Sequence, residues 1–111
     1  MATIADSGIR IDYFPVLVEA ALDRIALARC KMTDGRPRES SRLLAAAVTL
    51  VSRLRDDLDF SGGDSYAANL DDVCDYVSRQ LVTAQAQSRV ATLDEMSYLL
   101  REIRTAWVVY V

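Results

Sequence analysis

The chain has 111 residues, the length of one domain, and 51% of them are hydrophobic, which is enough to build a sizeable core. A formal net charge of -3 argues against nucleic acid as a partner, because phosphate binding depends on a basic surface. The chain contains no histidine, and its cysteines, Cys30 and Cys74, form no CxxC pair, so we expect two reduced, buried thiols, no metal site and no cofactor.

Membrane and secretory signals are also missing from the sequence. No apolar run approaches the ~20 residues that a membrane span requires, so we expect no membrane insertion. The start "MATIADSGIRIDYF" lacks a basic region followed by an apolar one. We therefore expect a cytoplasmic protein, with one domain over residues 1–111.

Three groups of helix-breaking or polar residues divide the chain: "TDGRP" at 33–37, "SGG" at 61–63 and "QAQSR" at 85–89. The segments between them have apolar residues at helical spacing and predict helices over about 12–32, 37–58, 64–86 and 92–109. Residues 1–11 are expected to be a flexible N-terminal segment. The predicted fold is all-α, an antiparallel four-helix bundle with this short segment packing against it.

Each predicted helix has its own start signal. Pro15 and Pro37 suit a first turn, where the missing N–H has no partner to lose. Asp64 is the expected N-cap of the third helix. "TLDE" from Thr92 to Glu95 has the pattern of a capping box and predicts the start of the fourth.

The apolar stripes of these helices define the expected core. The first stripe is Phe14, Leu17, Val18, Ala21, Leu22, Ile25, Ala28 and Met32. The third helix contributes Tyr66, Leu70, Val73, Val77, Leu81 and Ala84. The fourth contributes Leu93, Met96, Leu99, Leu100, Ile103 and Trp107. A fully buried Trp107 would cost roughly 3–5 kcal/mol on replacement by Ala.

The second helix has more apolar surface than one core requires. At ~100° per residue its apolar side chains fill an arc of roughly 160°, whereas a bundle helix needs little more than ~100°. Outside the stripes of the other helices lie Val16, Leu27, Tyr76, Tyr98 and Val109. This pattern fits either a helix at the centre of the bundle, with scattered apolar surface residues, or a groove that accepts another amphipathic helix. Periodicity does not choose between them.

Catalysis has little support in the sequence. There is no histidine to act as a general base near neutral pH. No GxSxG, P-loop or Gly-rich phosphate turn occurs, and the acidic residues are spaced to face solvent or helix N-termini. We predict a protein that is not an enzyme and has no catalytic residues.

An ordered series of motifs runs through the second half of the chain. A helix ending at Leu58–Asp59 precedes the Gly62–Gly63 turn, a helix containing "ANL" follows, and "LDEMSYLLREIRTAW" ends at Trp107. This series resembles the flagellar export chaperone FliS family over roughly residues 14–108. The matching positions are Leu54, Leu58, Asp59, Gly62, Gly63, Ala68, Asn69, Leu70, Tyr76, Leu81, Ala84, Leu93, Glu95, Leu99, Leu100, Ile103, Arg104, Ala106 and Trp107.

The resemblance implies a cytoplasmic chaperone that binds the C-terminal segment of flagellin, prevents its premature polymerisation and assists its export by the flagellar type III secretion system. Flagellin and the flagellar export apparatus are then the expected partners. On this interpretation the surplus apolar surface is the flagellin groove. Its expected residues are Leu44, Val48 and Val51 on the second helix and Val73, Tyr76, Val77 and Leu81 on the third.

Two segments have alternative interpretations. Ile9, Ile11 and Tyr13 alternate before the first helix and either fold over the groove as a plug, as in the family, or form a hydrophobic staple. The final residues, Val108 to Val111, are expected to meet a second chain, either flagellin or a homodimer mate. The rival functions are a helical-bundle adaptor or dimerisation module with no secretion role, and an enzyme with an acidic metal cluster.

Overall fold

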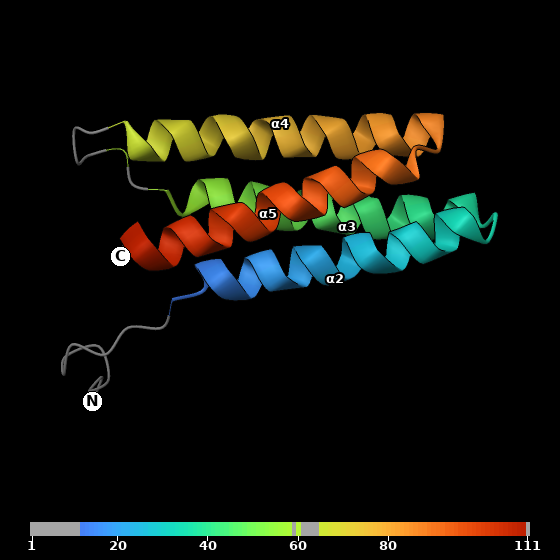
Figure 1. Cartoon of the computed structure of the whole chain (residues 1–111), viewed down its shortest axis with the longest axis horizontal. Coiled ribbons are helices and arrows are strands. Elements are labelled where there is room, and N and C mark those ends of the chain that lie inside the picture. Colours follow the sequence, from blue (N-terminus) through green and yellow to red (C-terminus); the bar gives the residue numbers. More distant parts are fainter. Residues whose placement is uncertain (1–11, 59, 61–64, 111) are drawn as a thin grey trace.

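Helices make up all the regular structure in the computed structural model, which describes residues 12–58, 60 and 65–110 and, for 108–110, the backbone alone. They are α2 (Phe14–Thr33), α3 (Pro37–Asp56), α4 (Tyr66–Gln87) and α5 (Val90–Tyr110) (Figure 1). The predicted all-α bundle is confirmed. Within these described residues, no helix is both long and apolar enough to cross a membrane.

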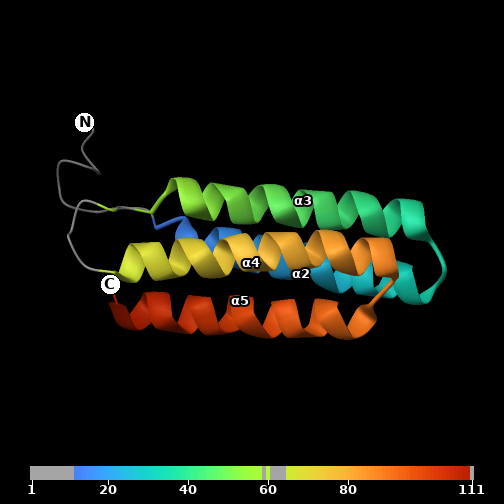
Figure 2. The same ribbon diagram turned by 90° about the horizontal axis from the view of Figure 1, so that it is seen from above.

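Each helix of the bundle packs against two others. α2 contacts α3 and α5, and α4 also contacts α3 and α5, so that α2 and α4 lie diagonally opposite each other (Figure 2). Successive helices run in opposite directions. One end of the bundle therefore carries the α2–α3 and α4–α5 connections, here called the turn end. The other end, here called the tryptophan end, holds the start of α2 and the end of α5, where Trp107 lies.

Both connections at the turn end use the same hydrogen-bonded motif. Gly35 has a φ of +72° after α2, and Ser88 has a φ of +52° after α4. In each case the next residue donates its backbone N–H back to the helix: Arg36 to the Lys31 carbonyl at 2.8 Å, and Arg89 to the Ala84 carbonyl at 2.9 Å. This left-handed ending reverses the chain within a few residues and makes the following helix antiparallel.

The core is built from the stripes that the spacing predicts. Five members of these stripes are only partly buried, and they lie toward the edges of the bundle: Met32, Tyr66, Val73, Leu99 and Trp107. The wide arc of α3 divides in the same way. Leu44, Ala47, Val51 and Leu54 are buried, whereas Leu43, Val48, Leu50 and Leu58 are partly buried. α3 lies between α2 and α4, so the two edges of its arc face two different neighbours.

Trp107 corrects one expectation about the core. Its side chain is only partly buried, and its ring stacks on Phe14 with ring centroids 4.0 Å apart and planes 11° from parallel. The indole Nε1–H donates to Asp12 Oδ2 at 2.8 Å, and Asp12 Oδ1 accepts the Phe14 backbone N–H at 3.0 Å. Trp107 therefore joins the end of α5 to the start of α2 rather than filling the centre of the bundle.

One predicted helix start differs from the structure, and another lies outside the described residues. The capping box is wrong, because α5 begins at Val90 and Thr92 to Glu95 lie inside it. The left-handed Ser88 completes the reversal so early that no cap at Thr92 is needed. α4 ends at Gln87, one residue beyond the predicted end of the third helix at about 86. The predicted N-cap Asp64 lies outside the described residues.

The two turns predict opposite responses to substitution. Gly35→Ala should lower the free energy of unfolding by about 1 kcal/mol, because the backbone is left-handed there while the space around a Cβ is open. Ser88→Gly should raise it by up to about 1 kcal/mol for the same reason. Urea unfolding of both variants measures the change. A loss in both variants would contradict the role assigned to left-handed backbone.

Trp107→Ala should lower the free energy of unfolding by about 2–3 kcal/mol, less than for a fully buried ring, through lost stacking and contact area. Trp107→Phe keeps an aromatic ring over Phe14 and loses the hydrogen bond to Asp12, so its cost should be about 1–2 kcal/mol. Tyr98→Ala on the exposed face of α5 is the control and should stay within about 0.5 kcal/mol. Equal losses of stability in Trp107→Ala and Tyr98→Ala on thermal melting would refute the proposed role of Trp107 in joining α5 to α2.

Candidate functional site

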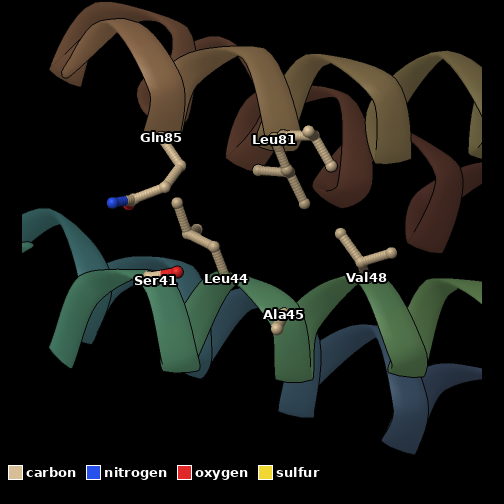
Figure 3. Close-up of a pocket in the computed structure, with 7 residues that line it drawn as sticks. Ser41, Leu44, Ala45, Val48, Leu81 and Gln85 are labelled. Carbon is tan, nitrogen blue, oxygen red and sulfur yellow. The ribbon is translucent and has the colours of Figure 1, made fainter. Parts of the chain in front are cut away.

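An apolar hollow of about 280 Å³ lies between α3 and α4 near the turn end. In Figure 3 the side chains of Leu44 and Val48 on α3 and of Leu81 on α4 point toward one another across it. We call this the α3/α4 groove. Its lining residues are Ser41, Leu44, Ala45, Val48, Leu81, Val82 and Gln85.

The groove has a floor of core residues and a wall that solvent reaches. Leu44 and Leu81 are buried in the described structure, at 3% and 0% exposure. Val48 is partly buried, and Val82 is 61% exposed. A partner helix laid here would therefore cover Val82 and Val48 and rest on Leu44 and Leu81, which is the geometry of helix-in-groove recognition.

Polar groups close the groove at the turn end. The fully buried Ser40 hydroxyl lies 2.8 Å from Gln85 Oε1 and 3.1 Å from the Pro37 carbonyl. Gln85 Nε2 donates to the same carbonyl at 3.2 Å. These bonds tie the last turn of α4 to the first turn of α3 and set the spacing of the two groove walls.

Ion pairs occupy the other end of the α3–α4 contact. Arg55 donates to both carboxylate oxygens of Asp71, at 2.7 and 3.1 Å, and lies 3.4 Å from Asp75, which also pairs with Arg79. The Arg55 hydrogen bond lowers the pKa of Asp71, and desolvation opposes this effect. Beneath these pairs, burial raises the pKa of the Cys74 thiol to about 11, so this cysteine stays protonated near neutral pH. The expectation of a buried thiol is wrong for Cys30, which is exposed on α2.

The structure brings together some of the predicted groove residues and separates others. Leu44, Val48 and Leu81 line the α3/α4 groove. Val51 and Val77 are fully buried in the core, so a partner does not reach them in this arrangement. Val73 is partly buried against the core. The remaining predicted residue, Tyr76, lies on the other side of α4.

Tyr76 lines a separate hollow between α4 and α5. It is 42% exposed there, beside Tyr98 at 59%. The sequence prediction placed Tyr76 and Leu81 in one groove, although Leu81 lies on the α4 stripe and Tyr76 to one side of it. The helix turns between them, however, and Tyr76 faces α5 whereas Leu81 faces α3. α4 therefore has one hollow along each edge.

Four groove residues were missed by the sequence prediction: Ser41, Ala45, Val82 and Gln85. Ser41 and Ala45 precede Leu44 and Val48 by three residues each, the spacing of neighbours on one helical face. Val82 was the detectable signal, because it is an apolar residue outside the α4 stripe. Gln85 had no apolar signal and takes its place through hydrogen bonds that appear only in the folded chain.

The proposed N-terminal plug is described only at Tyr13, since Ile9 and Ile11 lie outside the described residues. Tyr13 is 57% exposed and lies beside Trp107 and Asp57 at the tryptophan end, away from the α3/α4 groove at the turn end. The prediction that Val108 to Val111 meet a second chain is likewise not tested by the described residues. Val108 and Val109 are described by their helical backbone alone, and Val111 lies outside the described residues.

Comparison with known proteins decides the family. Residues 13–110 match the family model described as flagellar protein FliS. This chain belongs to the FliS family. It is 34% identical over 92 residues to the flagellar secretion chaperone FliSB of Pseudomonas aeruginosa, which covers 83% of this chain and 73% of the relative.

Two further relatives are both named flagellar secretion chaperone FliS. That of Vibrio cholerae is 27% identical over 92 residues, with 83% of this chain and 68% of the relative covered. That of Salmonella typhimurium is 27% identical over 93 residues, with 83% and 69% covered. FliS membership makes this protein a flagellar export chaperone rather than an enzyme.

The ion pairs at the end of the α3–α4 contact predict an acid-sensitive part of the stability. Asp71→Asn should lower the free energy of unfolding at pH 7 by about 0.5–1 kcal/mol, since the pair is partly exposed and screened. The folded pKa is lowered, so the carboxylate stabilises the fold above its unfolded pKa, near 3.8, and this contribution is lost as the pH falls through the folded value.

The neighbouring Asp72→Asn provides a matched control, because Asp72 is exposed and has no ion pair with any described residue. Denaturant melts of both variants between pH 7 and pH 3 measure the effect. Asp71→Asn should reduce the fall in the free energy of unfolding as the pH is lowered. Asp72→Asn should leave that fall unchanged. Identical pH profiles for the two variants would show that the ion pair between Arg55 and Asp71 does not stabilise the fold.

Proposed function

We propose that this protein holds the C-terminal segment of flagellin in the α3/α4 groove, prevents its premature polymerisation and assists its export by the flagellar type III secretion system. The observation that supports this most is an exposed apolar groove between two helices of a FliS-family chain. The protein acts in the bacterial cytosol. Its second partner is the flagellar export apparatus, which receives the flagellin.

The groove suits an amphipathic helix rather than a small molecule. Its rim is exposed to solvent at Ser41, Ala45 and Val82. Apolar area gives about 25 cal/mol per Å² on burial, and a client segment that orders on binding loses ~2–5 kcal/mol of that gain. A groove of this size alone gives a modest net affinity. The client therefore leaves without any chemical step.

The alternative function is an adaptor or dimerisation module with no secretion role. It predicts a homodimer in solution and no affinity for a flagellin tail. The exposed apolar residues on several faces, such as Val16 on α2 and Tyr98 on α5, are compatible with it. Family membership favours the chaperone.

Titration calorimetry with a peptide from the C-terminal region of the host's flagellin tests the proposal. We expect saturable binding near one to one with a negative heat-capacity change, the mark of apolar burial. Val82→Asp should weaken binding by about tenfold or more, since it places a charge on the groove wall.

Val16→Asp is the matched control, because Val16 is exposed to the same degree as Val82, 60% against 61%, but lies on α2 outside the groove. It should change the dissociation constant by no more than about twofold. Circular dichroism establishes that both variants are folded. Equal weakening by both substitutions would move the client away from the α3/α4 groove. A folded protein that binds no peptide and sediments as a dimer would favour the adaptor.

A further inference from the structure

The hollow between α4 and α5 has a chemistry that the proposed function does not use. It measures about 410 Å³ and is lined by Tyr76, Asp94, Glu95, Met96, Tyr98 and Leu99. Met96 is buried and Leu99 partly buried, so the floor is apolar. Tyr76 and Tyr98 flank it as exposed rings. Aromatic residues of this kind are favoured at interfaces because each offers a large face with few torsions to fix.

Acidic residues border these rings. Glu95 and Glu102 lie three residues before and four after Tyr98, which places all three on one side of α5. Asp72 lies one helical turn before Tyr76 on α4. All three carboxylates are exposed and have no ion pair with another described residue. We call this surface, Asp72, Tyr76, Glu95, Tyr98, Leu99 and Glu102, the tyrosine face.

The nearby cations are directed elsewhere. Arg79, the one basic residue in the sequence of α4, pairs with Asp75 in the contact toward α3. On α5, Arg104 pairs with Glu19 of α2, and Arg101 lines a different hollow with Arg29 between α2 and α5. Asp94 forms an ion pair with Arg29 of α2, with 2.7 Å between Arg29 Nε and Asp94 Oδ1. The tyrosine face therefore has an excess of negative charge around an apolar floor, with Arg101, three residues after Tyr98, at its border toward α2.

We propose that the tyrosine face is a second docking surface, which binds a cationic amphipathic helix of a second protein. The apolar side chains of this partner helix lie on Leu99 and Met96, and the arginines or lysines of the partner helix pair with Glu95 and Glu102. A guanidinium laid over Tyr76 or Tyr98 adds a cation–π contact, in which the positive charge is attracted to the face of the ring. The distance from Glu95 to Glu102 corresponds to roughly 10 Å, or about two turns, of helix, so a partner helix of about three turns extends past both carboxylates.

Charge argues against the other possible occupants. Two copies of this chain meeting through the tyrosine face would bring Glu95 and Glu102 of both copies together, and like charges in contact oppose association. Nucleic acid and anionic lipid surfaces are repelled by the same rim. A cationic peptide is the one occupant that gains from both the carboxylates and the rings.

The tyrosine face and the α3/α4 groove lie along opposite edges of α4. Leu81 and Val82 face α3, whereas Tyr76 faces α5, and no residue lines both hollows. The two surfaces can therefore be occupied at once. This proposal is independent of the flagellin assignment, because it rests on the charges and rings of the α4–α5 contact alone.

The test uses the full chain and a synthetic helix-forming peptide of about three turns, with leucines along one stripe and arginines on both edges. A counterpart has glutamates in place of the arginines. Calorimetry should show saturable binding of the arginine peptide that weakens with added salt, and none of the counterpart. Amide NMR shifts should fall on residues of α4 and α5 that surround Tyr76 and Tyr98.

Glu95→Lys with Glu102→Lys should weaken binding by about tenfold or more. The control is Asp23→Lys with Asp56→Lys, which makes the same change of net charge at exposed acids of α2 and α3 that have no ion pair with a described residue. It should weaken binding by no more than about threefold through the general field. Tyr98→Ser should also weaken binding while the protein stays folded.

Val82→Asp, which alters the α3/α4 groove, should leave the arginine peptide bound as before. If both double lysine variants weaken binding equally, the effect would come from net charge alone, which would overturn the proposal. So would shifts that map to the α3/α4 groove, an absence of binding, or displacement of the arginine peptide by the flagellin peptide. The last result would assign the tyrosine face to a second segment of the same client.

Discussion

The left-handed turns at Gly35 and Ser88 are the constraint on which the rest of the bundle depends. Each reverses the chain within a few residues, so α2 must lie beside α3 and α4 beside α5. The two hairpins then differ. α2 and α3 make the most extensive contact in the bundle and α4 and α5 the least, and in Figure 1 α5 runs at an angle away from α4. The α4–α5 hollow opens where this second hairpin separates, and Tyr76 and Tyr98 lie at its mouth instead of in a core.

The sequence predicted the helices and the core because both follow from local rules. Apolar residues at three- and four-residue steps define which side of a helix is buried, and the buried residues of α2 are those that the spacing selects. Prolines marked two helix starts for an equally local reason. The failure at Thr92 shows the limit of this reasoning. A capping-box pattern is a local preference, and the turn at Ser88, already satisfied by its own hydrogen bonds, made the cap unnecessary.

The candidate site could be predicted only in part, since a groove is a property of two helices. Periodicity identified Leu44, Val48 and Leu81 as apolar, but the azimuth at which α4 meets α3 and α5 separates Leu81 from Tyr76. The same packing took Val51 and Val77 into the core. Gln85 illustrates a second limit. Its importance comes from a bond to the buried Ser40, forty-five positions earlier in the chain, which no local pattern encodes.

The wide apolar arc of α3 had two interpretations, and the structure shows that they are compatible. α3 is packed between α2 and α4, which accounts for the width of the arc, and one edge of that arc is also the exposed wall of a groove. A helix in this position has to be apolar on two sides, and the hydroxyl–amide contact at Ser40 fixes how far its neighbour stands away. A shallow apolar groove with a fixed width recognises the shape of a helix more than its sequence. Electrostatic discrimination between partners must then come from another surface, and the carboxylates beside Tyr76 and Tyr98 are suited to supply it.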